Sequence, residues 1–144
     1  MNISDEIIAA RKCGVVHYGL SSLGSPSISE LAAEFGLASD AACYTEIDSS
    51  AARRLVRMIL NQDLAYNYEI IPNDRAAELA DRFLDQFGIE GVKFYSNGNF
   101  HEARRSKVTQ SGTSWNPATD ATFDTGVLIC GPMVSGCLWV EDED

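Results

Sequence analysis

Apolar side chains recur at helical spacing through the first third of the chain. A short first helix is expected to begin near Ser4, where two acidic residues follow a serine cap, and to end before Gly14. Ser27 and Glu30 have the spacing of a capping box, which predicts a second helix that stops at Gly36. Residues 14–19 between them fit either a brief strand or a turn.

Two longer helices are expected over residues 48–64 and 72–88. The apolar positions of the first of them repeat every three or four residues: Ala52, Leu55, Val56, Ile59 and Leu60. In the second, a proline-led start and Gly88 set the limits, and Glu78 is expected to pair with Arg82 on the exposed side. Residues 1–90 are therefore predicted to be mainly helical.

The pattern changes from helical to alternating after Gly91. Asn97-Gly98 is a strong signal for a two-residue turn, so residues 91–104 are expected to form a hairpin with Tyr95 opposite Phe100. The rest of the chain predicts two more strands, over residues 122–130 and 136–140, joined by a turn.

Helices followed by strands, without strict alternation, indicate an α+β protein. We expect N-terminal helices packed on one face of a C-terminal antiparallel sheet of about four strands. The 144 residues suit one domain, with a helical part over about 1–90, an antiparallel β part over about 91–141 and a short acidic tail over 141–144.

The net charge of −10 restricts the partners that the chain can bind. Such a charge repels phosphate backbones and attracts cationic proteins, so we expect no direct contact with nucleic acid. No apolar stretch approaches the length that crosses a bilayer, and the acidic start lacks the features of an export signal. These patterns predict a cytoplasmic protein that does not bind membranes.

The reactive residue types are few and scattered. Four cysteines lack the spacing of zinc or redox motifs and are expected to be reduced thiols: Cys13, Cys43, Cys130 and Cys137. His17 and His101 are the only histidines, and no nucleotide-binding glycine loop is present. We therefore expect no metal site and no cofactor.

Residues 28–37 resemble the first helix and turn of helix-turn-helix DNA-binding domains, including the glycine at the bend. Residues 39–46, where the second helix would follow, contain two acids and no basic residue, which does not suit DNA. A degenerate helix-turn-helix used for protein contacts remains one alternative, and it would expose the face around Leu31 and Phe35.

Phe123-Asp124-Thr125-Gly126 resembles the catalytic triplet of aspartic proteases, in which two such aspartates meet. The resemblance implies a homodimeric enzyme, whereas the plainer interpretation has Asp124 shaping a bend at the start of a strand. A small hydrolase using His17, or the carboxylate pair of Asp120 and Asp124, is therefore the enzyme alternative, with His17 and Asp124 as the weak catalytic candidates.

Aromatic residues next to acids predict a protein-binding surface. Trp115 lies in a polar loop, where it either tucks back onto the sheet or meets a partner. The last predicted strand runs into four acids, which form either a binding element or a solubilising tail that protects an edge strand. The expected partner-binding residues are Trp115, Asp120, Asp124, Trp139, Glu141, Asp142, Glu143 and Asp144.

These features favour a binding protein over an enzyme. We expect a small acidic inhibitor, of the immunity or antitoxin type, that neutralises a basic bacterial toxin or nuclease by covering its cationic cleft. An inhibitor should present a flat or convex patch of acids and aromatics, whereas an enzyme should have a pocket in which the candidate groups converge. The sequence leaves the oligomeric state open.

Overall fold

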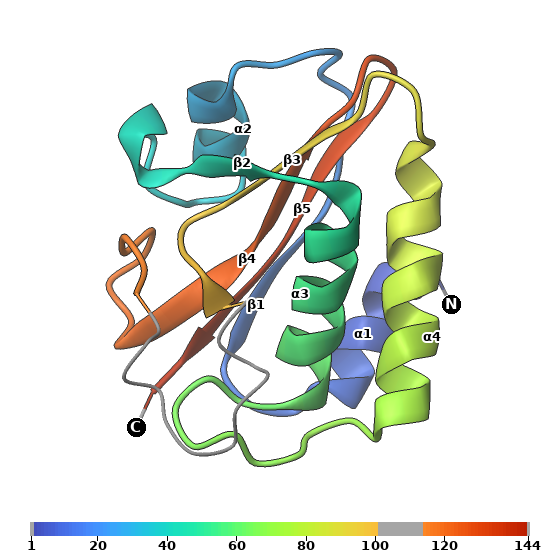
Figure 1. The fold of residues 1–144 in the computed structure, drawn as a ribbon, viewed down its shortest axis with the longest axis vertical. Helices are drawn as coiled ribbons and strands as arrows, with labels where there is room; N and C mark the ends of the chain where they lie inside the picture. Colours follow the sequence, from blue (N-terminus) through green and yellow to red (C-terminus); the bar gives the residue numbers. More distant parts are fainter. Residues whose placement is uncertain (1, 101–113, 144) are drawn as a thin grey trace.

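Helices precede most of the strands in the computed structural model, which describes residues 2–100 and 114–143 (Figure 1). The helices are α1 (Ile3–Ala10), α2 (Ile28–Glu34), α3 (Ser49–Asn61) and α4 (Asn73–Leu84), with short 3-10 turns η1 (Ala41–Cys43) and η2 (Asp85–Phe87). The strands are β1 (Val15–Ser21), β2 (Thr45–Ile47), β3 (Lys93–Ser96), β4 (Phe123–Cys130) and β5 (Ser135–Asp142). The predicted α+β class is confirmed.

The strands form one sheet in the order β1-β5-β4-β3-β2, and every neighbouring pair is antiparallel. The predicted pairing of the last two strands is confirmed, with Val127 opposite Leu138. The sheet has five strands rather than about four. Two of the five were not among the expected strands. β1 lies where the sequence fits either a strand or a turn, and β2 has only three residues and no run of apolar side chains to indicate a strand. The second arm of the expected hairpin is not a neighbour of β3.

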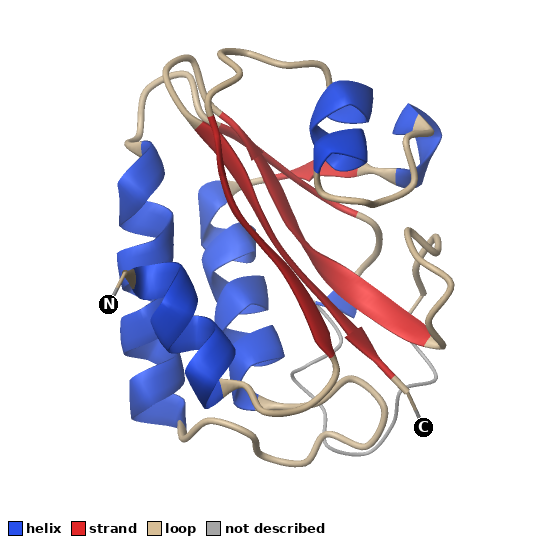
Figure 2. Ribbon diagram, turned by 180° about the vertical axis from the view of Figure 1, so that it is seen from behind, coloured by secondary structure: helices blue, strands red, loops and turns tan. Residues whose placement is uncertain are grey.

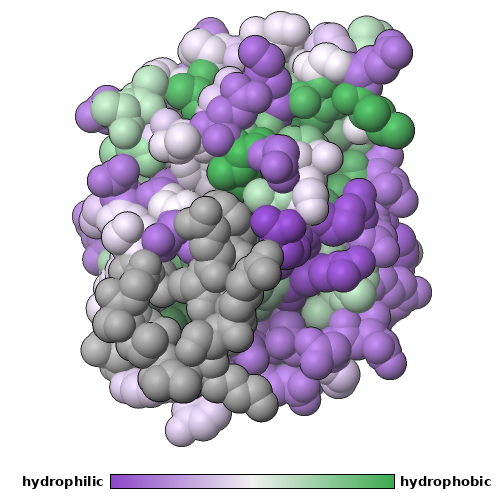
Figure 3. All heavy atoms as spheres, in the orientation of Figure 1, coloured by the Kyte–Doolittle hydropathy of each residue, from purple (hydrophilic) through white to green (hydrophobic). Residues whose placement is uncertain are grey.

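Helices cover both faces of the sheet. Figures 1 and 2 show α1, α3 and α4 together on one side and α2 on the other. The main core lies under the three helices, and a smaller cluster packs Leu31 of α2 against Leu128 and Trp139. Hydrophilic side chains lie over the outer surface of α3 and α4 (Figure 3). One face was expected to carry all the helices, but α2 covers the opposite face.

The predicted helix signals mostly hold. The Ser27 and Glu30 capping box is present, and Gly88 follows η2 with a positive φ of 76°. The expected Glu78–Arg82 ion pair is wrong, because Glu78 contacts Arg75 and the Arg82 guanidinium contacts Glu6 of α1. The Arg82–Glu6 ion pair thus links α4 to α1.

The predicted hairpin at Asn97-Gly98 is wrong. Tyr95 pairs with Glu46 of β2 on one side and with Leu128 of β4 on the other, so no position is left beside it for Phe100. Asn97 is buried and its side chain donates hydrogen bonds inside the protein, which removes it from a turn. Residues 101–104 of that expectation lie outside the described residues.

The helix-turn-helix resemblance does not extend beyond α2. The chain continues into the single 3-10 turn η1 and then into β2, without a second α-helix between them. Leu31 is fully buried, so the face that a protein-contact version would expose is part of the core. Tyr44, which packs edge-on against Trp139, holds this segment against the sheet.

Two further expectations concern membranes and thiols. No helix in residues 2–100 and 114–143 is long and apolar enough to cross a membrane. All four cysteines are unpaired, and Cys137 is fully buried.

Candidate functional site

Asp124 is a structural carboxylate in the interior. It is fully buried and accepts hydrogen bonds from the Asn97 side chain at 2.9 Å, the Ala118 backbone at 3.1 Å and the Trp139 indole at 3.0 Å. Thr119 adds a hydroxyl donor at 3.0 Å. Every one of these groups donates, which satisfies a carboxylate completely and fixes the loop before β4 to the sheet.

The predicted surface roles of Asp124 and Trp139 are therefore wrong, because both side chains are fully buried. Asp120 is exposed, as expected, but it is not among the hydrogen-bond partners of Asp124 and forms no carboxylate pair with it. The protease-like triplet serves here as the start of β4.

His17 joins β1 to two other elements. Its Nδ1 lies 2.9 Å from the backbone oxygen of Phe35, to which it donates, and its Nε2 lies 2.5 Å from the Glu141 carboxylate. Both ring nitrogens are therefore occupied by protein groups. His17 and Asp124 are not among the residues that line the hollows described below.

The acids at the end of β5 have different environments. Asp142 is buried and Glu141 is half-buried beside His17, so neither extends freely into solvent. Glu143 is exposed, and hydrogen bonds from Thr122 lower its carboxyl pKa. Asp144 lies outside the described residues. Among the tail acids that the structure describes, the expected exposed position holds for Glu143.

Trp115 tucks back onto the protein. Its ring lies between Phe100, at a centroid distance of 5.0 Å, and Phe123, at 5.4 Å. It is half-buried against the main core. Of the two expected positions for this side chain the structure has the tucked one, so Trp115 is not an exposed anchor.

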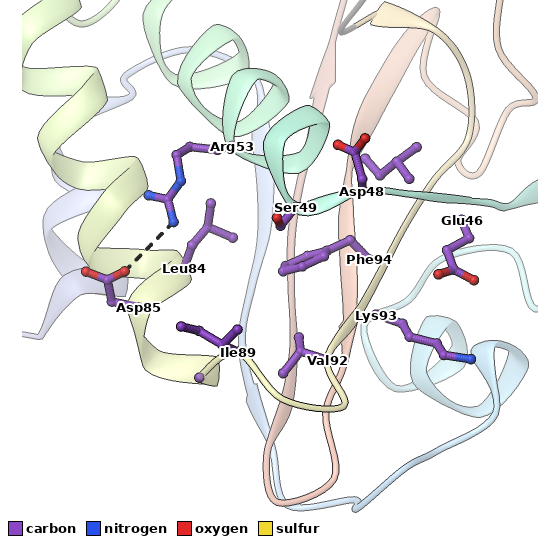
Figure 4. Close-up of a pocket in the computed structure, with 12 residues that line it drawn as sticks. Glu46, Asp48, Ser49, Arg53, Leu84, Asp85, Ile89, Val92, Lys93 and Phe94 are labelled. Carbon is purple, nitrogen blue, oxygen red and sulfur yellow. Dashed lines mark ion pairs between the residues drawn. The ribbon is translucent and has the colours of Figure 1, made fainter.

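A hollow of about 620 Å³ lies between the start of α3, η2 and the β2–β3 edge (Figure 4). Phe94 lies in its middle, and Arg53 forms an ion pair with Asp85 at 3.9 Å. Three acids and two bases line the hollow: Glu46, Asp48, Asp85, Arg53 and Lys93. Its charges largely compensate one another, so it has no strong preference for a charged ligand.

A second candidate surface surrounds the loop between α3 and α4, at the bottom of Figure 1. Tyr66 and Tyr68 are 58% and 71% exposed, and their rings are neighbours with centroids 5.9 Å apart. Beside Tyr68 lies a hollow of about 410 Å³ whose lining includes the acids Asp63, Glu69 and Glu143 and one basic residue, Lys12. We call the two tyrosines and the three acids the tyrosine surface.

The backbone that carries the two tyrosines is held in place. The Asp63 carboxylate accepts hydrogen bonds from the backbone N–H of Tyr66 at 2.9 Å and of Tyr68 at 2.6 Å. Asn67 between them has a left-handed φ of 61°, a conformation that asparagine accepts better than most residues. The tyrosines are therefore presented on a defined turn rather than on an unsupported loop.

The same loop is anchored to the buried end of β5. The backbone N–H of Leu64 donates to Asp142 at 2.8 Å, and Asp142 forms an ion pair with Arg11. At the other end of the loop, the N–H of Ile70 donates to the Asn61 carbonyl at 2.6 Å. Buried side chains thus fix the position of an exposed aromatic pair.

The sequence analysis missed Tyr66 and Tyr68. Like Trp115, they are aromatic residues in a polar loop, and this pattern could have predicted them as binding residues. The difference between the two loops is tertiary. Trp115 has Phe100 and Phe123 within reach, whereas the tyrosines are next to polar groups.

Within the described ranges, no group of three or more His, Cys, Asp or Glu side chains is placed to hold a metal ion. Comparisons with protein-family models, with curated proteins and with solved structures gave no match. The functional argument therefore depends on the geometry of this chain.

Proposed function

We propose that this protein is a small acidic binding protein, acting in the cytoplasm, that neutralises a basic bacterial toxin or nuclease by covering its cationic cleft. The observation that carries the proposal is the tyrosine surface, where two exposed and adjacent aromatic rings are bordered by carboxylates on a fixed turn. In this proposal the chain is the immunity protein or antitoxin, and the basic toxin or nuclease is its target.

Tyrosine suits this role because of its size and stiffness. A few residues carry most of the energy of a protein interface, and tyrosine is enriched among them. Its ring buries a large area while only two side-chain torsions are restricted. Because Asp63 already fixes the backbone at Tyr66 and Tyr68, little further order has to be imposed on binding.

The charge distribution supports a basic partner. Residues 13–52 contain no lysine or arginine and carry five acids: Glu30, Glu34, Asp40, Glu46 and Asp48. Residues 114–143 likewise contain no basic side chain. Several arginines of the helical layer are engaged with acids, as in the pairs of Arg53 with Asp81 and of Arg75 with Glu6, whereas Arg54 donates to Ser50. The uncompensated negative field would steer a cationic protein toward this molecule.

The proposal is tested with a basic protein that co-purifies with this chain from the cells that encode it. Tyr66→Ala and Tyr68→Ala should each speed dissociation by about 30-fold, the equivalent of about 2 kcal/mol at a central interface residue. Met133→Ala, which removes an 86% exposed apolar side chain from the turn between β4 and β5, is the control and should leave dissociation unchanged. Equal effects of all three changes would contradict the proposed surface.

Association tests the acidic part of the proposal separately. Glu69→Gln with Glu143→Gln should slow association and reduce its dependence on salt, because long-range attraction to a cationic cleft is weakened. Asp5→Asn with Asp74→Asn makes the same charge change on α1 and α4 and should have a smaller effect. Association that is faster at high salt would exclude a basic partner.

A further inference from the structure

One edge of the sheet has no partner strand. β1 pairs with β5 alone, so the opposite edge of this seven-residue strand is open within the described part of the chain. Natural proteins usually protect such edges with lysine, proline or a covering segment. β1 contains no proline, and no Asp, Glu, Lys or Arg occurs from Gly14 to Ser29. In a chain with 32 charged residues among 144, this edge is unusually neutral.

The open edge also carries exposed apolar side chains. Side chains alternate along a strand, so Val16, Tyr18 and Leu20 lie on the same face of the sheet. Tyr18 is opposite Leu138, which is fully buried in the main core. Tyr18 and Leu20 nevertheless remain 40% and 50% exposed, because the helices do not cover this part of β1. Backbone hydrogen-bonding groups and apolar surface are thus available along one line.

We propose that β1 pairs antiparallel with β1 of a second copy of this chain, which joins the two sheets into one. The charge distribution favours a second copy of the chain as the partner of this edge. Two copies that each carry −10 repel one another over most of their surfaces, and β1 itself brings no acidic side chain to the contact. The two carboxylates next to it are each held by a β1 side chain, Glu34 by Ser21 and Glu141 by His17. A basic partner would instead be drawn to the acidic surfaces. The inference does not depend on the proposed function.

The geometry of an antiparallel strand suits a symmetric pair. A two-fold axis perpendicular to the sheet maps β1 onto an antiparallel copy of itself and keeps the helical layers of both copies on the same face. With the axis at Gly19, Tyr18 of one copy lies opposite Leu20 of the other, and cross-strand aromatic and aliphatic pairs stabilise a sheet. A single strand edge is a small interface, so the dimer forms reversibly and depends on concentration.

Sedimentation of the full chain over a wide concentration range tests the proposal. The unmodified protein should change from monomer to dimer as concentration rises. Leu20→Lys should weaken the dimer by at least about tenfold, because it puts a charge opposite Tyr18 of the other copy and brings two lysines into diagonal positions. The matched control is Ile89→Lys, which charges a 92% exposed apolar residue at the end of the sheet (Figure 4) and should leave the dimer unchanged. A monomer at every concentration, or a dimer weakened equally by Ile89→Lys, would overturn the inference.

Hydrogen exchange of the unmodified protein provides a readout that does not require a variant to fold. The amide groups of residues 15–21 that point away from β5 should exchange slowly in the concentrated dimer and quickly in the diluted monomer. Other surface amides should be insensitive to concentration. Concentration-independent exchange along β1 in a protein that does dimerise would place the contact elsewhere and refute the inference.

Discussion

Arg11 and Asp142 form a buried, two-point ion pair between residues 131 positions apart in the chain. The guanidinium nitrogens lie 3.0 Å and 2.7 Å from the two carboxylate oxygens, and the side chains are 0% and 3% exposed. Arg11 also donates to the Ile59 carbonyl at 2.6 Å. The pair therefore connects the end of α1 to α3 and β5, and Asp142 in turn holds the tyrosine loop through Leu64.

Removal of one partner of this pair should be costly. Asp142→Leu leaves the Arg11 charge buried without a counter-charge and should lower the free energy of unfolding by about 3–5 kcal/mol. Urea unfolding measures this loss. Glu143→Gln, at the neighbouring exposed position, should change stability by less than about 0.5 kcal/mol. The double variant Arg11→Met with Asp142→Leu should be more stable than Asp142→Leu alone, and a less stable double variant would contradict the ion-pair argument.

The Asp124 network makes a separate prediction about stability. Asp124→Asn places an amide donor among groups that all donate, so the free energy of unfolding should fall by about 3 kcal/mol. The indole N–H resonance of Trp139 should shift as well, because Asp124 is its acceptor. Asp120→Asn is the matched control on the exposed side of the same loop and should be nearly neutral. A stable Asp124→Asn protein with an unchanged Trp139 signal would show that the network is unimportant.

Acid should remove the contribution of Glu6 to stability. Hydrogen bonds from Arg82 and then Arg75 lower the Glu6 pKa from its usual 4.5 to about 2. Because the pKa is lower in the folded state, the stabilisation is present above about pH 4.5 and is lost as the pH falls to about 2. The difference in unfolding free energy between the unmodified protein and Glu6→Gln should therefore shrink over this range. A constant difference would contradict the assignment.

The sequence predicted the parts of the fold that depend on local signals. The capping box at Ser27, the glycine stop at Gly88 and the turn between β4 and β5 were all found where local residue chemistry favours them. The turn predicted at Asn97-Gly98 was wrong, because a long-range contact determines the position of Asn97. Its amide is needed by Asp124, a residue 27 positions away, and this long-range demand outweighs the local preference of Asn-Gly for a turn.

The candidate site was less predictable, because exposure is a tertiary property. The aromatic residues and acids were correctly regarded as binding chemistry, but the sequence does not say which of them are buried. Trp139 and Asp124 proved to be partners of one another in the core, whereas Tyr66 and Tyr68 remained outside. The packing of α2 against the sheet buries the first two residues, and nothing comparable in the described part of the chain covers the two tyrosines.

Gly98→Ala should still destabilise the protein, although for a reason other than turn geometry. A Cβ at this position would meet the Ser114 carbonyl oxygen and would lie 2.6 Å from the Trp115 Cβ. The backbone of residues 114 and 115 would have to move, which should cost about 1–3 kcal/mol as overpacking does elsewhere. Thermal unfolding measures this loss, and the control is Ala121→Ser. Gly24→Ala is not a suitable control, because a Cβ at Gly24 also has a close contact. A neutral Gly98→Ala would mean that this contact is loose.

The central claim is that the tyrosine surface is where a partner binds, and hydrogen exchange of the complex tests it most directly. With the co-purified basic protein bound, protection should increase at the amides of residues 62–70, with Glu143 at the border of the protected region. Protection centred on α2 and β2, or confined to β1, with residues 62–70 exchanging as in the free protein, would contradict the account.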